Sequence, residues 1–282
     1  MSSLCLTMQS AISVGNSGLP LSFLAKSVIL SEAKNLIKIY MEKREVIYNG
    51  ESVKIYGTDV PEEILVCFTD SITAFNKIKK ASIADKDMLN AGIAAMIFRI
   101  LEGSGVKTHF IRQVSGTELL CRRLDVIPVE VIVRNVIAGS MAARLGLKEG
   151  IVPDEPVIDL CYKNDDLCDP LINDSHVLAL GLATRDELET VYALSRRIND
   201  ILRHLFDKVG IVLVDFKIEF GRLPSGEIVL ADEITPDNAR FWDSVTGERY
   251  DKDRFRRDMG RVGDAYRTMY RKVSEITEMA GI

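Results

Sequence analysis

The clearest pattern in the chain is the alternation of hydrophobic and charged positions within residues 211–234. The hydrophobic positions are Val214, Phe216, Ile218 and Phe220, and the charged positions between them are Asp215, Lys217 and Glu219. A period of two residues predicts a β-strand with one face in a core. Residues 222–226 contain a proline and a glycine and are typical of a turn, so residues 227–234 are predicted as the returning strand of a hairpin.

A turn centred near Pro224 would place Asp215 opposite Asp232, with Glu219 on the same face. Carboxylates on one face repel each other unless a cation lies among them, and hard oxygen ligands suit Mg²⁺ in company with substrate phosphates. An amphipathic hairpin with a solvated charged face gives the same pattern. Residues 235–243 favour a functional site, because they combine an arginine, acidic residues and the chain's only tryptophan in a proline-containing loop.

The first part of the chain after residue 41 is predicted to be rich in strands. Asn49-Gly50 is a two-residue hairpin signal between the first two β-like runs. Hydrophobic residues at helical spacing predict one helix, over residues 87–102, with Gly103 just past its end. The predicted strands are residues 45–48, 52–56, 64–68, 107–114 and 118–123.

Residues 126–135 predict a strand in which Glu130 and Arg134 lie on the same face. The strand leads into Gly139-Ser140 at the start of a short helix. The free N–H groups of a helix start can hold an anion such as phosphate. A serine at this place is also a common N-cap, so both interpretations stay open.

The longest predicted helix begins at a capping box in residues 184–187 and ends near Val209. Residues 150–183 before it are rich in proline, asparagine and aspartate, and we interpret them as mostly loop. Residues 252–279 are predicted to be helical, with an interruption at the glycines near residue 260.

Length and composition are those of a globular protein, with 282 residues, of which 47% are hydrophobic and 27% charged. The pattern predicts a β-rich lobe with one helix in residues 41–125 and a larger mixed lobe in residues 126–282, with a cleft between them. Residues 1–40 differ, because the first thirty contain a single charged residue, Lys26. We interpret them as an N-terminal extension whose sequence specifies no fold.

Several function classes do not fit the composition. A net charge of −5 argues against a general nucleic-acid binder, and no apolar run reaches the roughly 20 residues of a membrane span. Five scattered cysteines predict neither a disulfide framework nor a zinc site. The three histidines lack motif spacing and are expected to be structural or on the surface. We therefore expect a soluble protein of the cytoplasm.

Two long stretches resemble signature sequences of the SAICAR synthetase (phosphoribosylaminoimidazole-succinocarboxamide synthase) family. They are residues 126–140, VIPVEVIVRNVIAGS, and residues 213–221, LVDFKIEFG. The same family is matched by residues 232–243 (DEITPDNARFWD), by the stretch from Lys163 to Asp169-Pro and by residues 251–256 (DKDRFR). The resemblance covers residues 45–260 in order.

The resemblance implies a two-lobed α+β fold with a β-rich N-terminal lobe, a mixed α/β C-terminal lobe and a cleft like that of ATP-grasp enzymes or kinases. It also implies an ATP-dependent ligase that joins L-aspartate to carboxyaminoimidazole ribonucleotide (CAIR) in purine biosynthesis, through an acyl phosphate. A homodimer is expected.

The resemblance also implies roles for individual residues. Glu219 and Asp232 would hold Mg²⁺ on the ATP phosphates. The implied catalytic residues, which position groups and neutralise developing charge, are Asp215, Lys217, Arg134 and Arg240. The implied nucleotide contacts are Gly50, Lys54, Arg123, Asp125, Glu130 and Lys217. The implied substrate contacts, with arginines suited to phosphate and carboxylate, are Arg134, Ser140, Lys163, Asp169, Asp237 and Arg240.

One departure from the family concerns the glycine-tipped hairpin, which usually reads Gly-Lys-x-Lys. Here Glu51 and Val53 stand at the two lysine positions. Either Lys54 or a lysine from residues 77–86 compensates, or ATP binding is weaker.

Two other functions remain as alternatives. A different ATP-dependent kinase or ligase would share the carboxylates for Mg²⁺ but would not require aspartate. A relative that binds nucleotide without turnover would keep the core and lose the site, although Arg134, Glu219, Asp232 and Arg240 are all retained.

Overall fold

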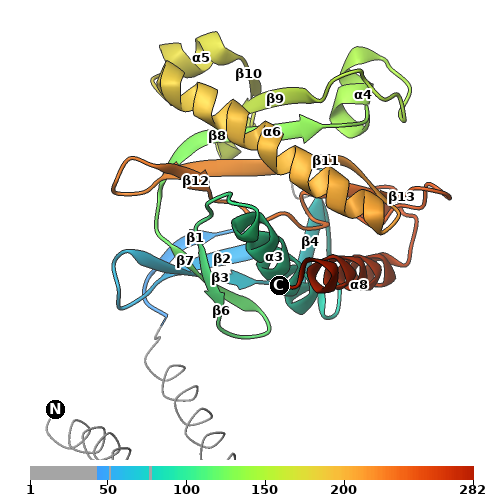
Figure 1. The fold of residues 1–282 in the computed structure, drawn as a ribbon, viewed down its shortest axis with the longest axis horizontal. Helices are drawn as coiled ribbons and strands as arrows, with labels where there is room; N and C mark the ends of the chain where they lie inside the picture. Colours follow the sequence, from blue (N-terminus) through green and yellow to red (C-terminus); the bar gives the residue numbers. More distant parts are fainter. Residues whose placement is uncertain (1–42, 51, 76–77) are drawn as a thin grey trace, which may run out of the picture. The chain divides into compact units, whose positions relative to one another are not determined.

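The computed structural model describes residues 43–50, 52–75 and 78–282. The extension predicted at residues 1–40 therefore lies outside the described residues, as does Glu51 of the hairpin. Residues 43–282 form one compact unit, in which two antiparallel sheets and their helices make a two-lobed α+β fold (Figure 1).

The smaller lobe is built on a five-stranded sheet with the order β1-β2-β3-β7-β6. Strands β4 and β5, which lie between β3 and α3 in the sequence, form a separate hairpin. The strands of the sheet are β1 (Val46–Asn49), β2 (Val53–Gly57), β3 (Glu63–Phe68), β6 (Phe110–Gln113) and β7 (Glu118–Arg122). The hairpin consists of β4 (Ser71–Ala74) and β5 (Lys79–Ser82).

The larger lobe is built on a six-stranded sheet with the order β10-β9-β8-β11-β12, in which β13 also pairs with β11. Its strands are β8 (Asp125–Arg134), β9 (Val157–Tyr162), β10 (Leu171–Ile172), β11 (Ile211–Arg222), β12 (Ile228–Leu230) and β13 (Ala239–Asp243). Strand β11 therefore has three partners, β8 along one edge and β12 and β13 along the other.

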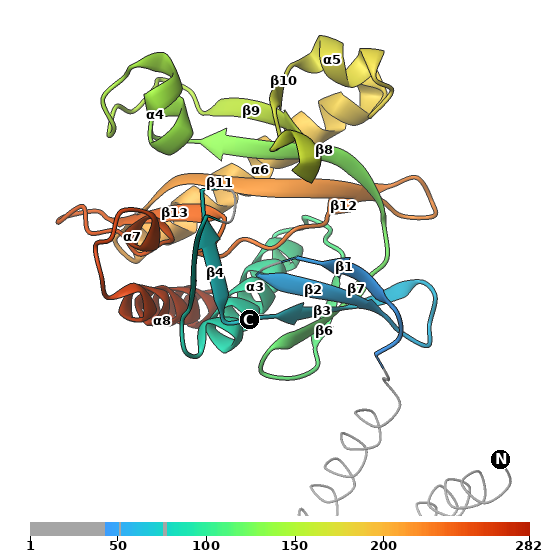
Figure 2. The same cartoon turned by 180° about the vertical axis from the view of Figure 1, so that it is seen from behind.

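Two long helices, α3 and α8, lie against each other, and α6 packs on β11 (Figures 1 and 2). The helices are α3 (Lys86–Gly103), α4 (Gly139–Leu145), α5 (Asp174–Ala179), α6 (Arg185–Lys208), α7 (Asp253–Arg256) and α8 (Val262–Ala280), with a 3₁₀ turn η1 (Asp165–Leu167). None of the helices in the described part of the chain has both the length and the apolar character needed to cross a bilayer.

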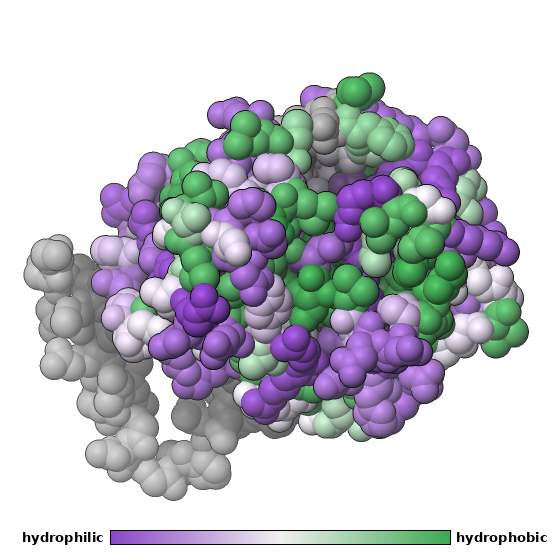
Figure 3. All heavy atoms as spheres, turned by 90° about the horizontal axis from the view of Figure 1, so that it is seen from above, coloured by the Kyte–Doolittle hydropathy of each residue, from purple (hydrophilic) through white to green (hydrophobic). Residues whose placement is uncertain are grey.

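Hydrophobic and hydrophilic side chains are interspersed on the face that Figure 3 shows. Exposed apolar side chains of the larger lobe include Leu145, Val152, Leu171 and Leu180. Such scattered positions are normal for a protein surface.

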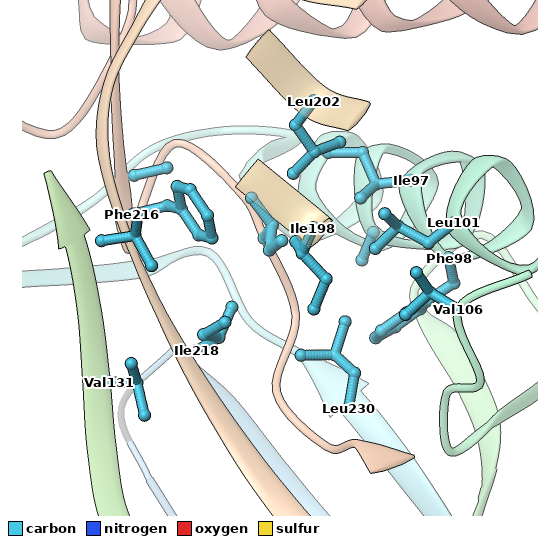
Figure 4. Close-up of a cluster of buried hydrophobic side chains, with 14 of the residues drawn as sticks. Ile97, Phe98, Leu101, Val106, Val131, Ile198, Leu202, Phe216, Ile218 and Leu230 are labelled. Carbon is cyan, nitrogen blue, oxygen red and sulfur yellow. The ribbon is translucent and has the colours of Figure 1, made fainter. Parts of the chain in front are cut away.

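A single hydrophobic cluster joins the two sheets (Figure 4). It contains Val66 and Phe68 of β3, and it continues through Ile97 of α3 to Ile198 of α6 and Phe216 of β11. Because these side chains are at most 7% exposed, the two lobes share one core. Phe216, Ile218 and Phe220 of β11 lie in this core, which explains why hydrophobic residues occupy alternate positions of the strand.

The face assignment of Val214 was wrong. The register between β11 and β13 shifts between Leu213 and Asp215, which is a β-bulge. The extra residue changes the phase of the strand, so Leu213 and Phe216 both enter the shared core. Val214 instead packs in a second cluster with Val136 and beside Trp242.

The hairpin after β11 is present, but its return strand is shorter than predicted. Leu223 and Glu227 close the turn, and β12 spans Ile228–Leu230 only. Asp215 does not lie opposite Asp232. It pairs in register with Arg134 of β8 and Arg240 of β13.

Three further predictions need correction. Residues 150–183 contain two strands and α5 besides loop, because β9 pairs along β8 in the larger sheet. Asn49 is not part of a two-residue turn, since it pairs with Lys54 in the ladder between β1 and β2. Gly103 is the last residue of α3 rather than the residue past its end.

The capping box of α6 is confirmed. The Thr184 hydroxyl accepts a hydrogen bond from the Glu187 N–H (3.3 Å), and the Glu187 carboxylate accepts one from the Thr184 N–H (2.8 Å). The Thr184→Ala variant should therefore lose about 1 kcal/mol of unfolding free energy, measured by urea denaturation.

The control is Thr190→Ala in the same helix, where an exposed hydroxyl bonds only to the Asp186 carbonyl. This change should stay within about 0.5 kcal/mol of the parent. Equal losses in the two variants would contradict the role of the cap.

Candidate functional site

A cleft of about 1020 Å³ lies between the two sheets. Its wall on the smaller sheet is largely apolar and includes Ile55, Val66 and Leu119. Its wall on the larger lobe is charged and includes, among others, Lys163, Lys217, Glu219 and Asp232. A cavity with one apolar and one charged wall can hold a molecule that has both a flat apolar part and an anionic part.

The charged wall is organised around the Lys217 ammonium group. Its Nζ atom lies 2.9 Å from Glu130 Oε1, 2.9 Å from Glu219 Oε1 and 3.0 Å from Asp232 Oδ2. Lys163 Nζ approaches the same Glu219 oxygen at 2.5 Å. Glu130 reaches the group because it faces Glu219 in the register of β8 and β11. Lysines therefore provide the cations that the carboxylate pattern required.

The environment separates the protonation states of these groups. Burial disfavours the charge of Lys217, but Asp232, Glu219 and Glu130 raise its pKa well above its usual range. Burial also opposes the charge of Asp232, and Lys217 outweighs it, so the pKa of Asp232 falls to about 2. Burial raises the pKa of the adjacent Glu233 well above its usual value, and Asp232 adds to this effect. The site therefore favours the ionised form of Asp232 and disfavours the ionised form of Glu233.

A second ionic network lies along β11, beyond the bulge. Asp215 accepts hydrogen bonds from Arg134 Nη1 (3.0 Å) and from Arg240 Nη1 (2.8 Å). The Arg134 guanidinium is also bonded to Asp159 (2.8 Å) and to the Ser140 hydroxyl (3.2 Å). Asp215, Arg134, Ser140 and Arg240 are not among the described residues that line the cleft. The structure therefore brings these four together, at a place separate from the lysine cluster.

The start of α4 is part of the second network. Its N-cap is Ala138, so the interpretation of Ser140 as an N-cap was wrong. Gly139 has φ of +54°, and a Cβ at this position would collide with the Arg240 guanidinium. Glycine is therefore required for the close approach of Arg240. The Gly139 N–H donates to the Glu149 carboxylate (2.9 Å).

Further charged residues extend this network, and the sequence analysis gave none of them a role. Glu149 also accepts hydrogen bonds from Arg249 (2.9 Å) and Arg257 (2.5 Å), and Arg257 is the main cause that lowers the pKa of Glu149 to about 2. Asp253 bonds to Arg240 Nε (3.0 Å) and to Arg256 (2.8 Å). The signals in the sequence were the density of charges in residues 248–257 and the family match of residues 251–256, which contain Asp253 and Arg256.

Asp237 forms a third group, at the cleft. Its carboxylate accepts hydrogen bonds from Lys86 Nζ (2.6 Å), Asn90 Nδ2 (2.7 Å) and the Tyr266 hydroxyl (2.8 Å). Lys86 is completely buried. Burial opposes the charge of Asp237, but Lys86 lowers its pKa below the usual value. None of the three partners was predicted, because they come from α3 and α8, far away in the sequence.

The remaining predicted residues divide between the cleft and its surroundings. Gly50, Arg123 and Asp169 line the cleft. Lys54 lies opposite Cys67 in the sheet and is not among the described residues that line the cleft. Asp125 forms a salt bridge with Arg222 (3.0 Å) on the outside of the strand.

The two positions where the family has lysines also differ here. Val53 lines the cleft as an apolar residue. Of the lysines in residues 77–86, Lys79 bonds to Asp258 (2.6 Å) and Lys86 to Asp237, and neither lines the cleft.

His109 is a buried residue of the cleft wall. Its position agrees with the expectation that the histidines are structural or on the surface. Its ring packs edge-on against Phe98, with 5.4 Å between the ring centroids. Burial lowers the pKa of His109 to about 4.

A two-lobed α+β protein with these charged groups in and beside its interlobe cleft belongs to the class of enzymes that bind a nucleotide together with a second anionic substrate. Comparison with known proteins identifies the family. The family model of SAICAR synthetase matches residues 46–273, and the chain belongs to this family.

Named relatives agree with the family. The chain is 52% identical over 235 residues to a phosphoribosylaminoimidazole-succinocarboxamide synthase from Clostridium botulinum (strain Loch Maree / Type A3), a match that covers 83% of this chain and 100% of the relative. The crystal structure of the synthase from Ehrlichia chaffeensis has a TM-score of 0.79 at 42% identity and covers 82% of this chain and 98% of its own. A SAICAR synthetase (Type-2) in complex with ADP has the same TM-score at 44% identity, with the same coverage.

The buried His109 predicts a pH dependence of stability. The unfolded chain takes up a proton near pH 6.5, whereas folded His109 stays neutral down to about pH 4. Its contribution to stability is therefore present above pH 6.5 and falls by about 3 kcal/mol as the pH decreases to 4. The His109→Phe variant should lose this dependence in urea titrations.

Burial also raises the pKa of Asp251 to about 7, which makes the folded protein more stable as the pH decreases and so opposes the effect of His109. The quantity to compare is therefore the difference in unfolding free energy between variant and parent at each pH. His204→Phe, at an exposed position of α6, is the matched control. Parallel stability curves for His109→Phe and the parent would contradict the assignment.

Proposed function

We propose that this protein joins L-aspartate to CAIR with cleavage of ATP, and so forms SAICAR, ADP and phosphate in purine biosynthesis. The observation that carries the proposal is a lysine and carboxylate cluster that faces an apolar wall across the cleft, in a chain 52% identical to a named synthase. The relative in complex with ADP supports a nucleotide in this cleft.

The reaction proceeds in two steps. An oxygen of the CAIR carboxylate forms a bond to the γ-phosphorus of ATP, while the bond between this phosphorus and the β,γ-bridging oxygen breaks and ADP leaves. The aspartate amine then forms a C–N bond to the acyl carbon, the C–O bond to phosphate breaks, and the amine loses a proton. Both steps develop negative charge on phosphate oxygens, so fixed cations accelerate them.

The cleft is suited to the nucleotide. Its apolar wall accommodates the base, with the Gly50 tip and Arg123 at the edge of the same space. Lys163 and Lys217 lie on the opposite wall and reach toward the phosphates. Val53 stands where the hairpin of the family usually has a lysine. Lys163 and Lys217 would therefore supply a larger share of the phosphate contacts here than in family members that have the hairpin lysines.

The donor set also fits Mg²⁺. Among the described residues, no group of three or more histidine, cysteine or acidic side chains is arranged to hold a metal alone. Two carboxylates, Glu219 and Asp232, are nevertheless enough for Mg²⁺, which takes its other ligands from phosphates and water. When bound, Mg²⁺ neutralises phosphate charge.

The arginine network is suited to the phosphate of the ribonucleotide. It contains more arginines than acids, and planar guanidinium groups suit an oxyanion. Arg134 is already bonded to Asp215, Asp159 and Ser140, so a bound phosphate would have to take the place of some of these contacts. The arginines are Arg134, Arg144, Arg240, Arg249, Arg256 and Arg257, and the acids are Glu149, Asp159, Asp215 and Asp253. The excess positive charge leaves room for a dianion. Asp169 and Asp237 would face the aspartate and CAIR from the cleft, with Lys163 between these substrates and the nucleotide phosphates.

Three broader properties belong to the same proposal. Residues 41–125 supply the nucleotide-binding lobe, and residues 126–282 supply the metal and substrate site. The location is the cytoplasm, which the thiol state of the described cysteines Cys67, Cys121 and Cys161 supports. The working form is a homodimer, which sedimentation would test.

The function is tested by ADP release from Mg-ATP in the presence of CAIR, with and without L-aspartate. We expect ADP and SAICAR to form in equal amounts, only when both substrates are present. Release that does not need aspartate would instead support a different ATP-dependent kinase. A folded protein that releases no ADP would support the alternative that the protein binds nucleotide without turnover.

The metal assignment predicts that Asp232→Asn abolishes turnover, because a neutral amide is a poor ligand for Mg²⁺ and leaves Lys217 with one fewer counter-charge. Turnover should decrease by at least about a hundredfold, measured as SAICAR formation. The Asp154→Asn variant, at an exposed position outside the cleft lining, should be as active as the parent. Near-parental activity of Asp232→Asn would refute the metal assignment.

A further inference from the structure

The Lys217 ammonium group is completely engaged by protein carboxylates. An ammonium has three N–H donors, and three acceptors from three different strands or loops surround it: Glu130, Glu219 and Asp232. Lys163 adds a second ammonium on the same Glu219 oxygen. The two ammonium groups thus balance two of the three carboxylate charges of the cluster.

The oxygens that the lysines engage are those proposed to hold Mg²⁺. Glu219 Oε1 receives both ammonium groups, and Asp232 Oδ2 receives Lys217. A divalent cation on the same oxygens would stand a few ångströms from one or two ammonium charges. Repulsion at such a distance is weakly screened in a partly buried site and opposes binding of the metal. The lysines and the metal therefore compete for one set of ligands.

Phosphate groups remove this competition. Lys217 and Lys163 are 27% and 35% exposed at their side chains, and both line the cleft. A lysine has a flexible stem, unlike the fixed fork of the buried Arg134. Nucleotide phosphates in the cleft would offer both ammonium groups new acceptors and would bring additional ligands for the metal.

We propose that Lys217, assisted by Lys163, is an internal counter-ion that occupies the metal ligands when no nucleotide is bound and transfers to the phosphates when nucleotide enters. This inference rests on the proposed function. Its consequence is that the protein binds a divalent cation tightly only together with nucleotide. Binding of metal without nucleotide, which would block the phosphate contacts of Lys217, is suppressed.

The test measures Mn²⁺ binding by electron paramagnetic resonance, with and without the non-hydrolysable ATP analogue AMPPNP. For the parent protein, AMPPNP should increase the affinity for Mn²⁺ by about tenfold or more, beyond the binding of Mn²⁺ to AMPPNP alone. For Lys217→Met, the affinity for Mn²⁺ without nucleotide should increase by about tenfold, and the effect of AMPPNP should shrink. A merely structural role of Lys217 would decrease both affinities.

The matched control is Lys107→Met, which removes an exposed lysine paired with Glu227 outside the cleft lining. Its Mn²⁺ binding should equal that of the parent. Lys163→Met retains Lys217 and should shift Mn²⁺ binding in the same direction by a smaller factor, and it serves as the test should Lys217→Met not fold.

Two results would overturn the proposal. One is a parent protein whose own sites bind Mn²⁺ with the same affinity in the presence and absence of AMPPNP. The other is a folded Lys217→Met or Lys163→Met variant that binds Mn²⁺ without nucleotide no more tightly than the parent. Either result leaves the ligase function intact if SAICAR still forms. A parent protein that binds no Mn²⁺ under any condition would refute the metal assignment itself.

Discussion

The antiparallel register between β8 and β11 is the constraint on which both charged networks depend. It places Glu130 opposite Glu219 and Arg134 opposite Asp215, at the short separation of cross-strand neighbours. The opposite face of β11 carries Phe216 in the shared core. A shift by one residue would turn the charges into the apolar core and the apolar side chains away from it. The core therefore determines the register, and the register determines which charged residues face each other.

The charged networks are costly for the fold. Desolvation of ions is only partly recovered by their attraction, so buried ion pairs are weak stabilisers. Here Arg134, Asp215 and Lys86 are almost completely buried. Under the proposed function, ligand binding explains their presence better than stability does. Electrostatic groups in a partly dry site act strongly on a substrate and need little rearrangement when it binds.

The sequence predicted the features that local pattern determines. The alternation in β11 and the capping box of α6 are examples, because periodicity and caps act over a few residues. It could not predict the bulge at Val214, which depends on the pairing with β13. For the same reason it missed Lys86, which reaches Asp237 across 151 positions of the chain. The family resemblance pointed to residues that the structure groups in and beside the cleft, but it could not reveal that lysines already contact the carboxylates.

The shared hydrophobic cluster has a consequence for how the protein accommodates ligands of different size. There is no seam between the lobes, because one close-packed interior continues from β3 through α3 to β11. A rigid hinge motion would have to shear this interior. Strand β1, by contrast, is exposed along its whole length and lies at the edge of its sheet. The cleft therefore has a floor that belongs to the shared core and a rim formed by an exposed edge strand, and we expect adjustment to ligand shape at that rim.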